Sequence, residues 1–188
     1  FNYPGFGQDN AATAFIQPGS SIKPFVFAEL FKDKGDGKQN YGSGIVLRDE
    51  NVDKIYGAKL YNWDSRFMGN LTIRRSLALS RNTPAVKAMY ISGVEPTVET
   101  IRAIGNESYC KQEEAATGGL FLSSAIGSCG SKEVDLTNAY ATLGRMGVYK
   151  PSTSVIEVKN SQGDVLKKWK DESKEVLDPQ IAYILNDI

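Results

Sequence analysis

The chain has 188 residues, the size of one ordinary domain, and its 22 basic and 22 acidic residues give a formal net charge of zero. Hydrophobic residues make up 41% of it, a composition typical of a globular protein with a real core. A chain without net charge has no long-range field to attract nucleic acid, so we expect no nucleic-acid partner. The histidine count is also zero, which excludes histidine-activated nucleophiles and histidine metal ligands. Any catalysis must use Ser, Lys, Tyr or carboxylates.

The metal-binding patterns in the sequence are incomplete. Cys110 and Cys129 form neither a zinc-ligand pattern nor a Cys-x-x-Cys motif. The segment Asp49-x-Asn51-x-Asp53 opens like a calcium loop, but Lys54 stands where Gly is needed and Leu60 stands where a bidentate Glu is needed. We therefore expect no metal site and no cofactor.

The N-terminal part of the chain is predicted to hold one helix between polar loops. Residues 1–19 are rich in Gly, Pro, Asn and Gln and favour an extended loop. A helix capped by Ser20 or Ser21 should follow and end at Lys32, because apolar residues recur there at helical spacing. Residues 33–44 are turn formers and predict a surface loop.

The middle of the chain alternates extended segments with helices. The predicted elements are a strand over 45–47, an irregular or extended stretch over 56–63, and helices from 72 to about 80, over 85–92 and over 96–104. The first two helices should meet at a tight corner at Ser80-Arg81-Asn82, because Pro84 can open a helix but fits poorly inside one. Gly93 and Gly105 stop the last two helices.

The last third of the chain predicts a helix, a hairpin and another helix. The helix over 133–145 is amphipathic. Its inner face is expected to consist of Val134, Leu136, Ala139, Tyr140 and Leu143. Residues 155–169 predict a β-hairpin around a polar turn, and Asp178-Pro179 should start a helix that is still running at Ile188. The predicted fold class is therefore mainly α with a small β-hairpin.

Without histidine, a nucleophile on this chain would be a serine activated by a lysine. Ser20 and Lys23 are three residues apart, so on a helix their side chains lie on one face about one turn apart. A helix N-terminus can also support a developing oxyanion. The spacing alone is weak evidence, because Ser108 and Lys111 repeat it in a polar loop. The alternative for Ser20 is a plain helix cap.

A second group of polar residues lies about sixty residues further on. Ser80 offers a hydroxyl that can relay a proton with Lys23, and Asn82 offers a carboxamide that can hold both the lysine and a substrate amide. The alternative is that Ser80 and Asn82 only cap helices. If the two groups share a site, the Ser80 hydroxyl should lie within about 3 to 4 Å of the Lys23 amine.

At this point the sequence resembles a known family. The resemblance covers nearly the whole chain, in the family's order, through Gln17-Pro18-Gly19-Ser20-Ser21-Ile22-Lys23-Pro24-Phe25, Tyr61-Asn62-Trp63-Asp64, Leu79-Ser80-Arg81-Asn82-Thr83-Pro84-Ala85-Val86, and Asn138-Ala139-Tyr140-Ala141-Thr142-Leu143 with Gly147-Val148-Tyr149. With Ser-x-x-Lys and Ser-x-Asn present, these segments resemble the transpeptidase domain of class A, bifunctional penicillin-binding proteins.

The resemblance implies a role for each site residue. Ser20 would be the acylated nucleophile, Lys23 its general base, Ser80 the proton shuttle and Asn82 a contact to the substrate's amide. The implied activity is that of a peptidoglycan D,D-transpeptidase, which cross-links stem peptides through an acyl-serine intermediate and is acylated by β-lactams. The implied parent protein works at the extracytoplasmic face of the bacterial cytoplasmic membrane. The resemblance also implies that a segment outside this chain anchors the parent in the membrane, and that the parent is bifunctional, with a glycosyltransferase activity.

One motif of the family is missing. No Lys of this chain is followed by Ser-Gly or Thr-Gly, and in the family that strand follows the position where this chain stops. We therefore expect residues 1–188 to be the helical core portion of a β-lactamase-like transpeptidase domain with most of the central sheet missing, and to be inactive alone. The alternatives are a serine D,D-carboxypeptidase or β-lactamase-like hydrolase, and a non-catalytic penicillin-sensing domain.

The resemblance also bears on the two cysteines. The family works outside the cytoplasmic membrane, where disulfides persist, and Cys110 and Cys129 are the only cysteines of the chain. A bridge between them is expected. Two unrelated thiols are the alternative.

Overall fold

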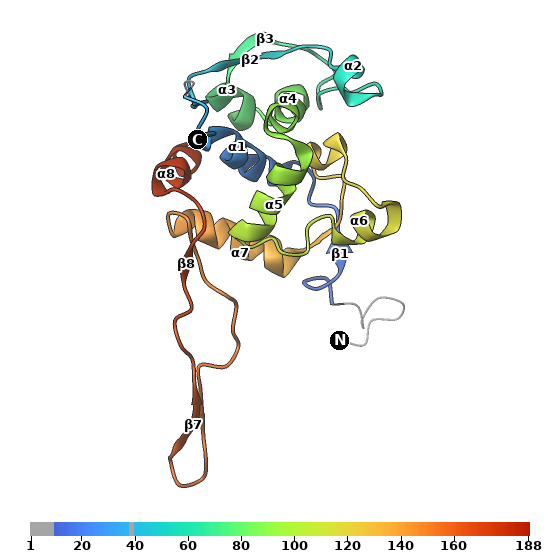
Figure 1. Cartoon of the computed structure of the whole chain (residues 1–188). Coiled ribbons are helices and arrows are strands. Elements are labelled where there is room, and N and C mark those ends of the chain that lie inside the picture. The colour runs from blue at the N-terminus through green and yellow to red at the C-terminus, as the bar shows by residue number, and fades with distance from the viewer. Residues whose placement is uncertain (1–9, 38–39) are drawn as a thin grey trace.

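One helix, α1 (Lys23–Phe31), lies at the centre of the molecule (Figure 1). In this computed structural model, which describes residues 10–37 and 40–188, it packs against α4 (Asn82–Ser92), α5 (Val94–Ile104) and α8 (Pro179–Asp187). The side chains of α1 that form the core are Phe25, Val26, Phe27, Ala28 and Leu30, all with no exposed surface. A helix that is apolar on every side has to be covered on every side, and this explains its central position.

The other helical elements surround this core. They are η1 (Gly19–Ile22), α2 (Asp53–Tyr56), α3 (Ile73–Ala78), α6 (Lys111–Thr117), η2 (Leu122–Ile126) and α7 (Glu133–Gly144), of which η1 and η2 are 3₁₀ turns. Side-chain caps start two of the helices: the Thr72 hydroxyl accepts the N–H of Arg75, and the Asp178 carboxylate accepts the N–H of Gln180. No helix in residues 10–37 and 40–188 is long and apolar enough to cross a bilayer.

The strands form antiparallel pairs. These are β1 (Phe15–Ile16) with β4 (Ser131–Lys132), β2 (Val46–Asp49) with β3 (Gly69–Thr72), β5 (Val148–Tyr149) with β8 (Lys174–Glu175), and β6 (Glu157–Lys159) with β7 (Val165–Lys168). Within the described part of the chain no sheet has more than two strands. The predicted fold class, mainly α with a small β-hairpin, is confirmed.

The N-terminal loop prediction was wrong in one place. Phe15 and Ile16 form β1, which pairs with a strand more than a hundred residues further on, and a local sequence pattern carries no information about such a partner. Residues 1–9 of that predicted loop lie outside the described residues. In the predicted surface loop over 33–44, residues 38–39 also lie outside them, and the rest holds neither helix nor strand.

Several other short elements were not predicted: α2, α6, η2, β3, β4, β5 and β8. The inner face predicted for α7 was also too wide. Ala139 and Leu143 are buried, whereas Val134 and Tyr140 are 40% and 41% exposed. The reason is that α7 contacts the body through one side, where it meets α5 and α8, and its other side is left open.

Candidate active site

Ser20 lies in the 3₁₀ turn η1, directly before α1. The predicted cap was wrong: Ser20 is exposed and caps neither η1 nor α1, and the Ser21 hydroxyl donates to the carbonyl of Pro18 at 2.7 Å. In a 3₁₀ turn, residues three apart lie one above the other. Ser20 and Lys23 therefore share a face, although the local structure differs from the α-helix that was expected.

The amine of Lys23 is directed at the Ser-x-Asn motif. Its Nζ donates to the carbonyl of Ser80 at 2.7 Å, to Oδ1 of Asn82 at 2.7 Å and to the Ser80 hydroxyl at 3.2 Å. The predicted distance between Lys23 and the Ser80 hydroxyl is thus confirmed. Because the amine has three N–H donors, these partners satisfy a charged group that is only 1% exposed.

Lys23 is also prepared electrostatically. Burial, and to a smaller extent the nearby guanidinium of Arg81, together lower the pKa of its amine from 10.5 to about 8. A lysine that acts as a general base near neutral pH needs burial or a neighbouring cation. This site supplies both.

Ser80 occupies a strained corner between α3 and α4. Its φ is +52°, a left-handed conformation that favours glycine. The N–H of Ser80 donates to the carbonyl of Leu77, and the N–H of Arg81 donates to the carbonyl of Ser76, which is the hydrogen-bond pattern of a Schellman turn. Glycine would fill this position with less strain, but it has no hydroxyl to place on Lys23. Backbone strain of this kind is typical of functional sites.

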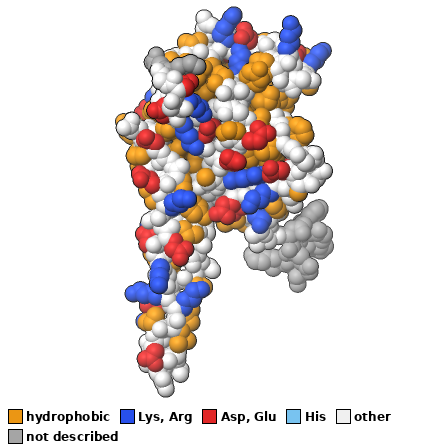
Figure 2. Space-filling view, in the orientation of Figure 1, with side chains coloured by type: hydrophobic (Ala, Val, Ile, Leu, Met, Phe, Trp, Pro, Cys, Tyr) orange, Lys and Arg blue, Asp and Glu red, His pale blue; other side chains and the backbone are white. Residues whose placement is uncertain are grey.

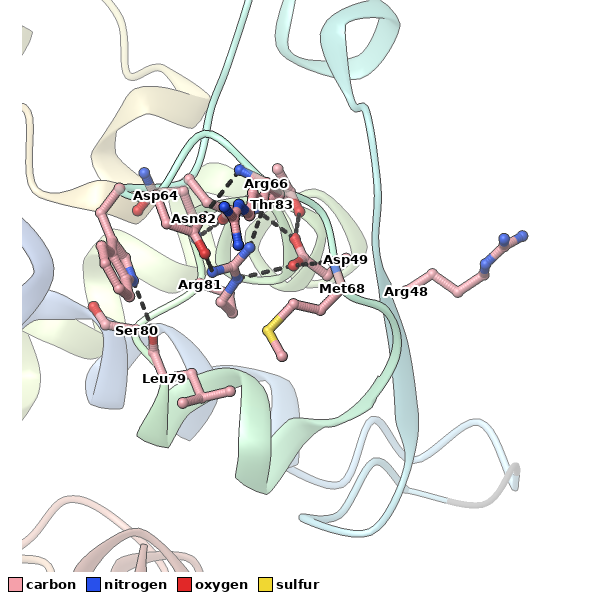
Figure 3. A network of polar contacts seen from close by, with 12 residues as sticks. Arg48, Asp49, Asp64, Arg66, Met68, Leu79, Ser80, Arg81, Asn82 and Thr83 are labelled. Carbon is pink, nitrogen blue, oxygen red and sulfur yellow. Dashed lines mark hydrogen bonds and ion pairs between the residues drawn. The ribbon is translucent and has the colours of Figure 1, made fainter.

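Arg81 lies in a buried polar network together with Asp49 and Asp64 (Figure 3). The side chain is 1% exposed. Its Nε donates to Asp49 at 2.8 Å, its Nη1 donates to Asp64 at 2.9 Å, and its Nη2 donates to the carbonyl of Arg66. The two carboxylates come from the end of β2 and from the loop before β3. Arg81 therefore joins the Ser-x-Asn corner to the β2–β3 ribbon.

Asp49 is the centre of this network and has no exposed surface. Besides Arg81, it accepts hydrogen bonds from Asn62 Nδ2 at 2.8 Å, from Thr83 Oγ1 at 2.6 Å and from the N–H of Met68 at 3.0 Å. Burial alone would raise the pKa of Asp49, but these donors and the charge of Arg81 hold it below its ordinary value. The network is thus held by an ionised, fully bonded carboxylate.

The same network fixes the carboxamide of Asn82. Asn62 Oδ1 accepts the N–H of Asn82 at 2.7 Å, and Nδ2 of Asn82 donates to the carbonyl of Tyr61 at 2.8 Å. With Oδ1 on Lys23, each end of the carboxamide has one partner in the protein. An amide offers two donors and two lone pairs, so one donor and one acceptor position remain for a ligand.

A cleft of about 390 Å³ opens beside Ser20, and we call it the serine cleft. Its polar side carries Ser20, Lys23 and Ser80. Its remaining lining is Ser21, Pro24, Leu77, Ala78, Tyr140, Leu185 and Ile188. Ser108, from the second Ser-x-x-Lys, does not line this cleft: its hydroxyl is buried elsewhere and accepts the N–H of Lys132 at 2.9 Å.

Cys110 and Cys129 form a disulfide, with Cα atoms 4.9 Å apart. This is the pair that the resemblance implied. The bridge ties the start of α6 to the loop after η2, close to the Gly127 carbonyl that accepts the N–H of Gly19 at 3.2 Å. In residues 10–37 and 40–188, no group of three or more His, Cys, Asp or Glu side chains could hold a metal ion.

Comparisons with known proteins agree with the resemblance found in the sequence. No protein-family model matches the chain. Penicillin-binding protein 4 of Bacillus subtilis is 28% identical over 180 residues, which cover 93% of this chain and 27% of that protein. Penicillin-binding protein 1A of Clostridium tetani is 28% identical over 188 residues, which cover 95% of this chain and 24% of that protein. The chain thus spans about a quarter of the length of these curated relatives.

The solved structures decide the fold. The penicillin-binding protein PonA1 from Mycobacterium tuberculosis matches 95% of this chain with a TM-score of 0.81, at 22% identity and over 47% of its own chain. The D,D-transpeptidase domain of a peptidoglycan glycosyltransferase from Eggerthella lenta matches 95% of this chain with a TM-score of 0.75, at 17% identity and over 49% of its own chain. This chain has the fold of a penicillin-binding protein transpeptidase domain. Its homologues over most of its length are class A penicillin-binding proteins, as the resemblance indicated.

In this penicillin-binding protein fold, the Ser-x-Asn motif is anchored by residues that sequence reasoning did not single out: Arg81, Asp49 and Asn62. One signal was available, because Arg81 is the only charged residue in the stretch 76–86, and an arginine inside a buried corner requires a carboxylate partner. Which carboxylate would serve could not be read from the sequence. Asp49 was weighed there only as a calcium ligand.

Proposed function

We propose that residues 1–188 form part of a peptidoglycan D,D-transpeptidase domain, with Ser20 as the nucleophile. The observation that carries this proposal is the Lys23 amine, which is buried, has a lowered pKa and is hydrogen-bonded to both Ser80 and Asn82 of the Ser-x-Asn motif. The arrangement gives an exposed hydroxyl a base without any histidine.

The proposed acylation uses each of these groups once. The neutral Lys23 amine removes the Ser20 proton while Oγ attacks the carbonyl carbon of the stem peptide's terminal amide bond. The C–N bond breaks, and Lys23 returns a proton to the leaving amine through the Ser80 hydroxyl, 3.2 Å away. An acyl-serine ester remains. The amine of a second stem peptide then attacks this ester, which restores Ser20 and forms the cross-link.

Asn82 is proposed to hold the substrate. Its free donor and acceptor positions match the C=O and N–H of a peptide amide, and the network through Asn62 and Tyr61 fixes its orientation before a ligand arrives. A β-lactam carries the same kind of amide and acylates the same serine. Related solved structures contain penicillin V bound to PonA1 and an imipenem acyl-enzyme of penicillin-binding protein A.

The wider setting is part of the same proposal. The partners are peptidoglycan stem peptides and β-lactams, and the parent protein works at the extracytoplasmic face of the cytoplasmic membrane. The chain holds no Lys-Ser/Thr-Gly, the motif that in the resembling family supplies a second lysine and a strand N–H for the oxyanion. We therefore propose that the 188 residues alone acylate slowly or not at all.

Labelling with a fluorescent penicillin tests the proposal. A longer natural chain that adds a Lys-Ser/Thr-Gly strand should label at least about three orders of magnitude faster than the 188 residues, since losing one oxyanion donor alone costs about a hundredfold or more. In the longer chain Ser20→Ala should abolish labelling. Ser108→Ala, in the second Ser-x-x-Lys, is the matched control and should leave it intact.

The outcomes separate the candidate functions. Equal labelling of Ser20→Ala and the unaltered chain would remove Ser20 as the nucleophile. Rapid loss of the label with release of penicilloate would favour a hydrolase, and a stable adduct in a protein that forms no cross-links would favour a penicillin-sensing domain. Rapid labelling of the 188 residues would contradict the expected dependence on the third motif.

A further inference from the structure

Tyr140 reaches the nucleophile's turn from a distant part of the chain. It lies on α7, and it was predicted to be a core residue, but it is 41% exposed and lines the serine cleft. Its Oη donates to the carbonyl of Ser21 at 2.6 Å, across 119 positions of sequence. Its ring packs edge-on against Phe25 of α1, with centroids 5.0 Å apart and an interplanar angle of 74°.

The carbonyl of Ser21 is short of a local partner. In a 3₁₀ turn, a carbonyl accepts the N–H three residues further on. For Ser20 that donor is the N–H of Lys23, but for Ser21 it would be Pro24, which has no N–H. An outside donor is therefore useful at Ser21, directly beside the nucleophile, and the phenol of Tyr140 provides it.

We propose that Tyr140 is a positioning residue that holds the η1 turn, and through it the hydroxyl of Ser20, in line with Lys23. This inference rests on the proposed function of Ser20. The turn is fastened from its other end by the hydrogen bond from the N–H of Gly19 to the carbonyl of Gly127, 3.2 Å long. These two hydrogen bonds, one from α7 and one to the end of η2, restrict the movement of the turn that carries the exposed Ser20.

The chemistry of the phenol suits this task. Burial raises the pKa of Tyr140 above its ordinary value, so the group keeps its proton throughout the range in which Lys23 changes charge. It acts as a hydrogen-bond donor to a backbone carbonyl, not as an acid or base. Removing only its oxygen should therefore change the position of Ser20 and leave the fold intact.

The substitution Tyr140→Phe tests this in the longer chain that labels with fluorescent penicillin. We expect the second-order acylation rate constant to fall about five- to tenfold, the loss that corresponds to one hydrogen bond, with the melting temperature unchanged within about 2 °C. Tyr149→Phe is the matched control, because the Tyr149 phenol also makes one short hydrogen bond, to Glu107 at 2.6 Å, away from the cleft. It should not change the rate.

A second measurement uses the 188 residues and needs no acylation. With Ser20→Cys, the pH dependence of alkylation by iodoacetamide reports the pKa of the introduced thiol, since Cys110 and Cys129 are bonded to each other. A thiol held beside the Lys23 ammonium should titrate below its usual pKa of about 8.5. Adding Tyr140→Phe should move its pKa back toward that value and slow alkylation at pH 7 several-fold, and adding Tyr149→Phe should not.

The results distinguish the two proposals. If Ser20→Ala still labels but the thiol pKa responds to Tyr140→Phe, the positioning role stands and the nucleophile assignment falls. If Tyr140→Phe changes neither the labelling rate nor the thiol pKa, the positioning role is wrong. It is also wrong if Tyr149→Phe changes the labelling rate and the thiol pKa in the same direction and to the same extent as Tyr140→Phe, because the effect would then follow from the general loss of a phenol hydrogen bond.

Discussion

Lys23 carries a positive charge in a place where water hardly reaches it, with 1% of its surface exposed. At its ordinary pKa of 10.5, about one amine in 3,000 would be neutral at pH 7, whereas at a pKa of about 8 the neutral fraction is about one in eleven. The difference corresponds to about 3 kcal/mol. Burial supplies most of it and the Arg81 guanidinium supplies the rest, so the base is prepared by residues of this chain alone.

A pH profile follows from that pKa. In the proposed mechanism the neutral Lys23 amine is the base, and a lowered pKa means that the amine becomes neutral at a lower pH. Acylation of Ser20 should therefore rise about tenfold per pH unit below about 8 and level off above it. In the 188-residue chain, the ¹³Cε resonance of Lys23 should titrate with a midpoint near 8. A midpoint above 10 would contradict the burial and charge argument.

Residue types could be predicted from the sequence more readily than residue positions. The Ser-x-x-Lys and Ser-x-Asn spacings each place their own residues within one turn of chain, whereas the contact between Lys23 and Ser80 spans 57 positions and was indicated by the family resemblance. The role of Asp49 could not be predicted, since its partners Arg81 and Thr83 follow more than thirty residues later and only the packing of α4 against β2 brings them together. Tyr140 was misjudged because helical periodicity cannot tell a cleft wall from a core.

At the scale of elements, η1 is held by close backbone approach as well as by Tyr140. Gly127, the residue that ends η2, has φ +75° and lies against Gly19. A Cβ atom at Gly127 would meet the carbonyl oxygen of Gly19 at 2.1 Å and its nitrogen at 2.5 Å. Glycine is thus required at Gly127 both for the left-handed conformation and for the contact with the nucleophile's turn.

The substitution Gly127→Ala should therefore be far more costly than an ordinary glycine replacement. We expect a loss of about 2 to 4 kcal/mol in the free energy of unfolding, from strain and overpacking together. Gly118→Ala is the matched control: Gly118 ends α6 with φ +74°, but a Cβ there meets nothing within 4 Å, so strain alone should cost about 1 kcal/mol. Urea denaturation measures both. Equal losses in the free energy of unfolding would show that the contact with Gly19 does not add to the cost of Gly127→Ala.

Helices bounded by glycine were predicted well from the sequence, and the shortest elements were not. Helix α5 ends before Gly105, as the sequence indicated, and begins at Val94, two residues before the predicted start at Pro96. Helix α2 has only four residues, and the carboxylate of its Asp53 accepts the N–H of Leu60 from outside the helix. Such a turn depends on contacts that form only after the chain has folded, so no periodicity reveals it.

At the scale of the whole molecule, an arm projects from the helical body (Figure 1). It consists of residues 151–172 and contains β6 and β7, all of whose residues are exposed. Figure 2 shows hydrophobic side chains on this arm and both signs of charge mixed over the face above it. The hairpin was predictable because its turn and strands are adjacent in sequence. The body was not, because it is assembled from distant pairs such as β1 with β4 and α1 with α8.

The arm should contribute little to the stability of the body. At its base, β5 pairs with β8 through Tyr149 and Lys174, so a two-residue Asn-Gly turn in place of residues 151–172 can join Lys150 to Ser173. The shortened chain loses an exposed Lys150–Asp171 ion pair, which is worth little. We expect its melting temperature to stay within about 2 °C of the original. Leu177→Ala, which truncates a buried side chain just beyond β8, is the contrast and should cost about 2 to 5 kcal/mol. A large fall in the melting temperature of the shortened chain would show that the arm unfolds cooperatively with the body. It would also show that the arm stabilises the body even though its strands are exposed.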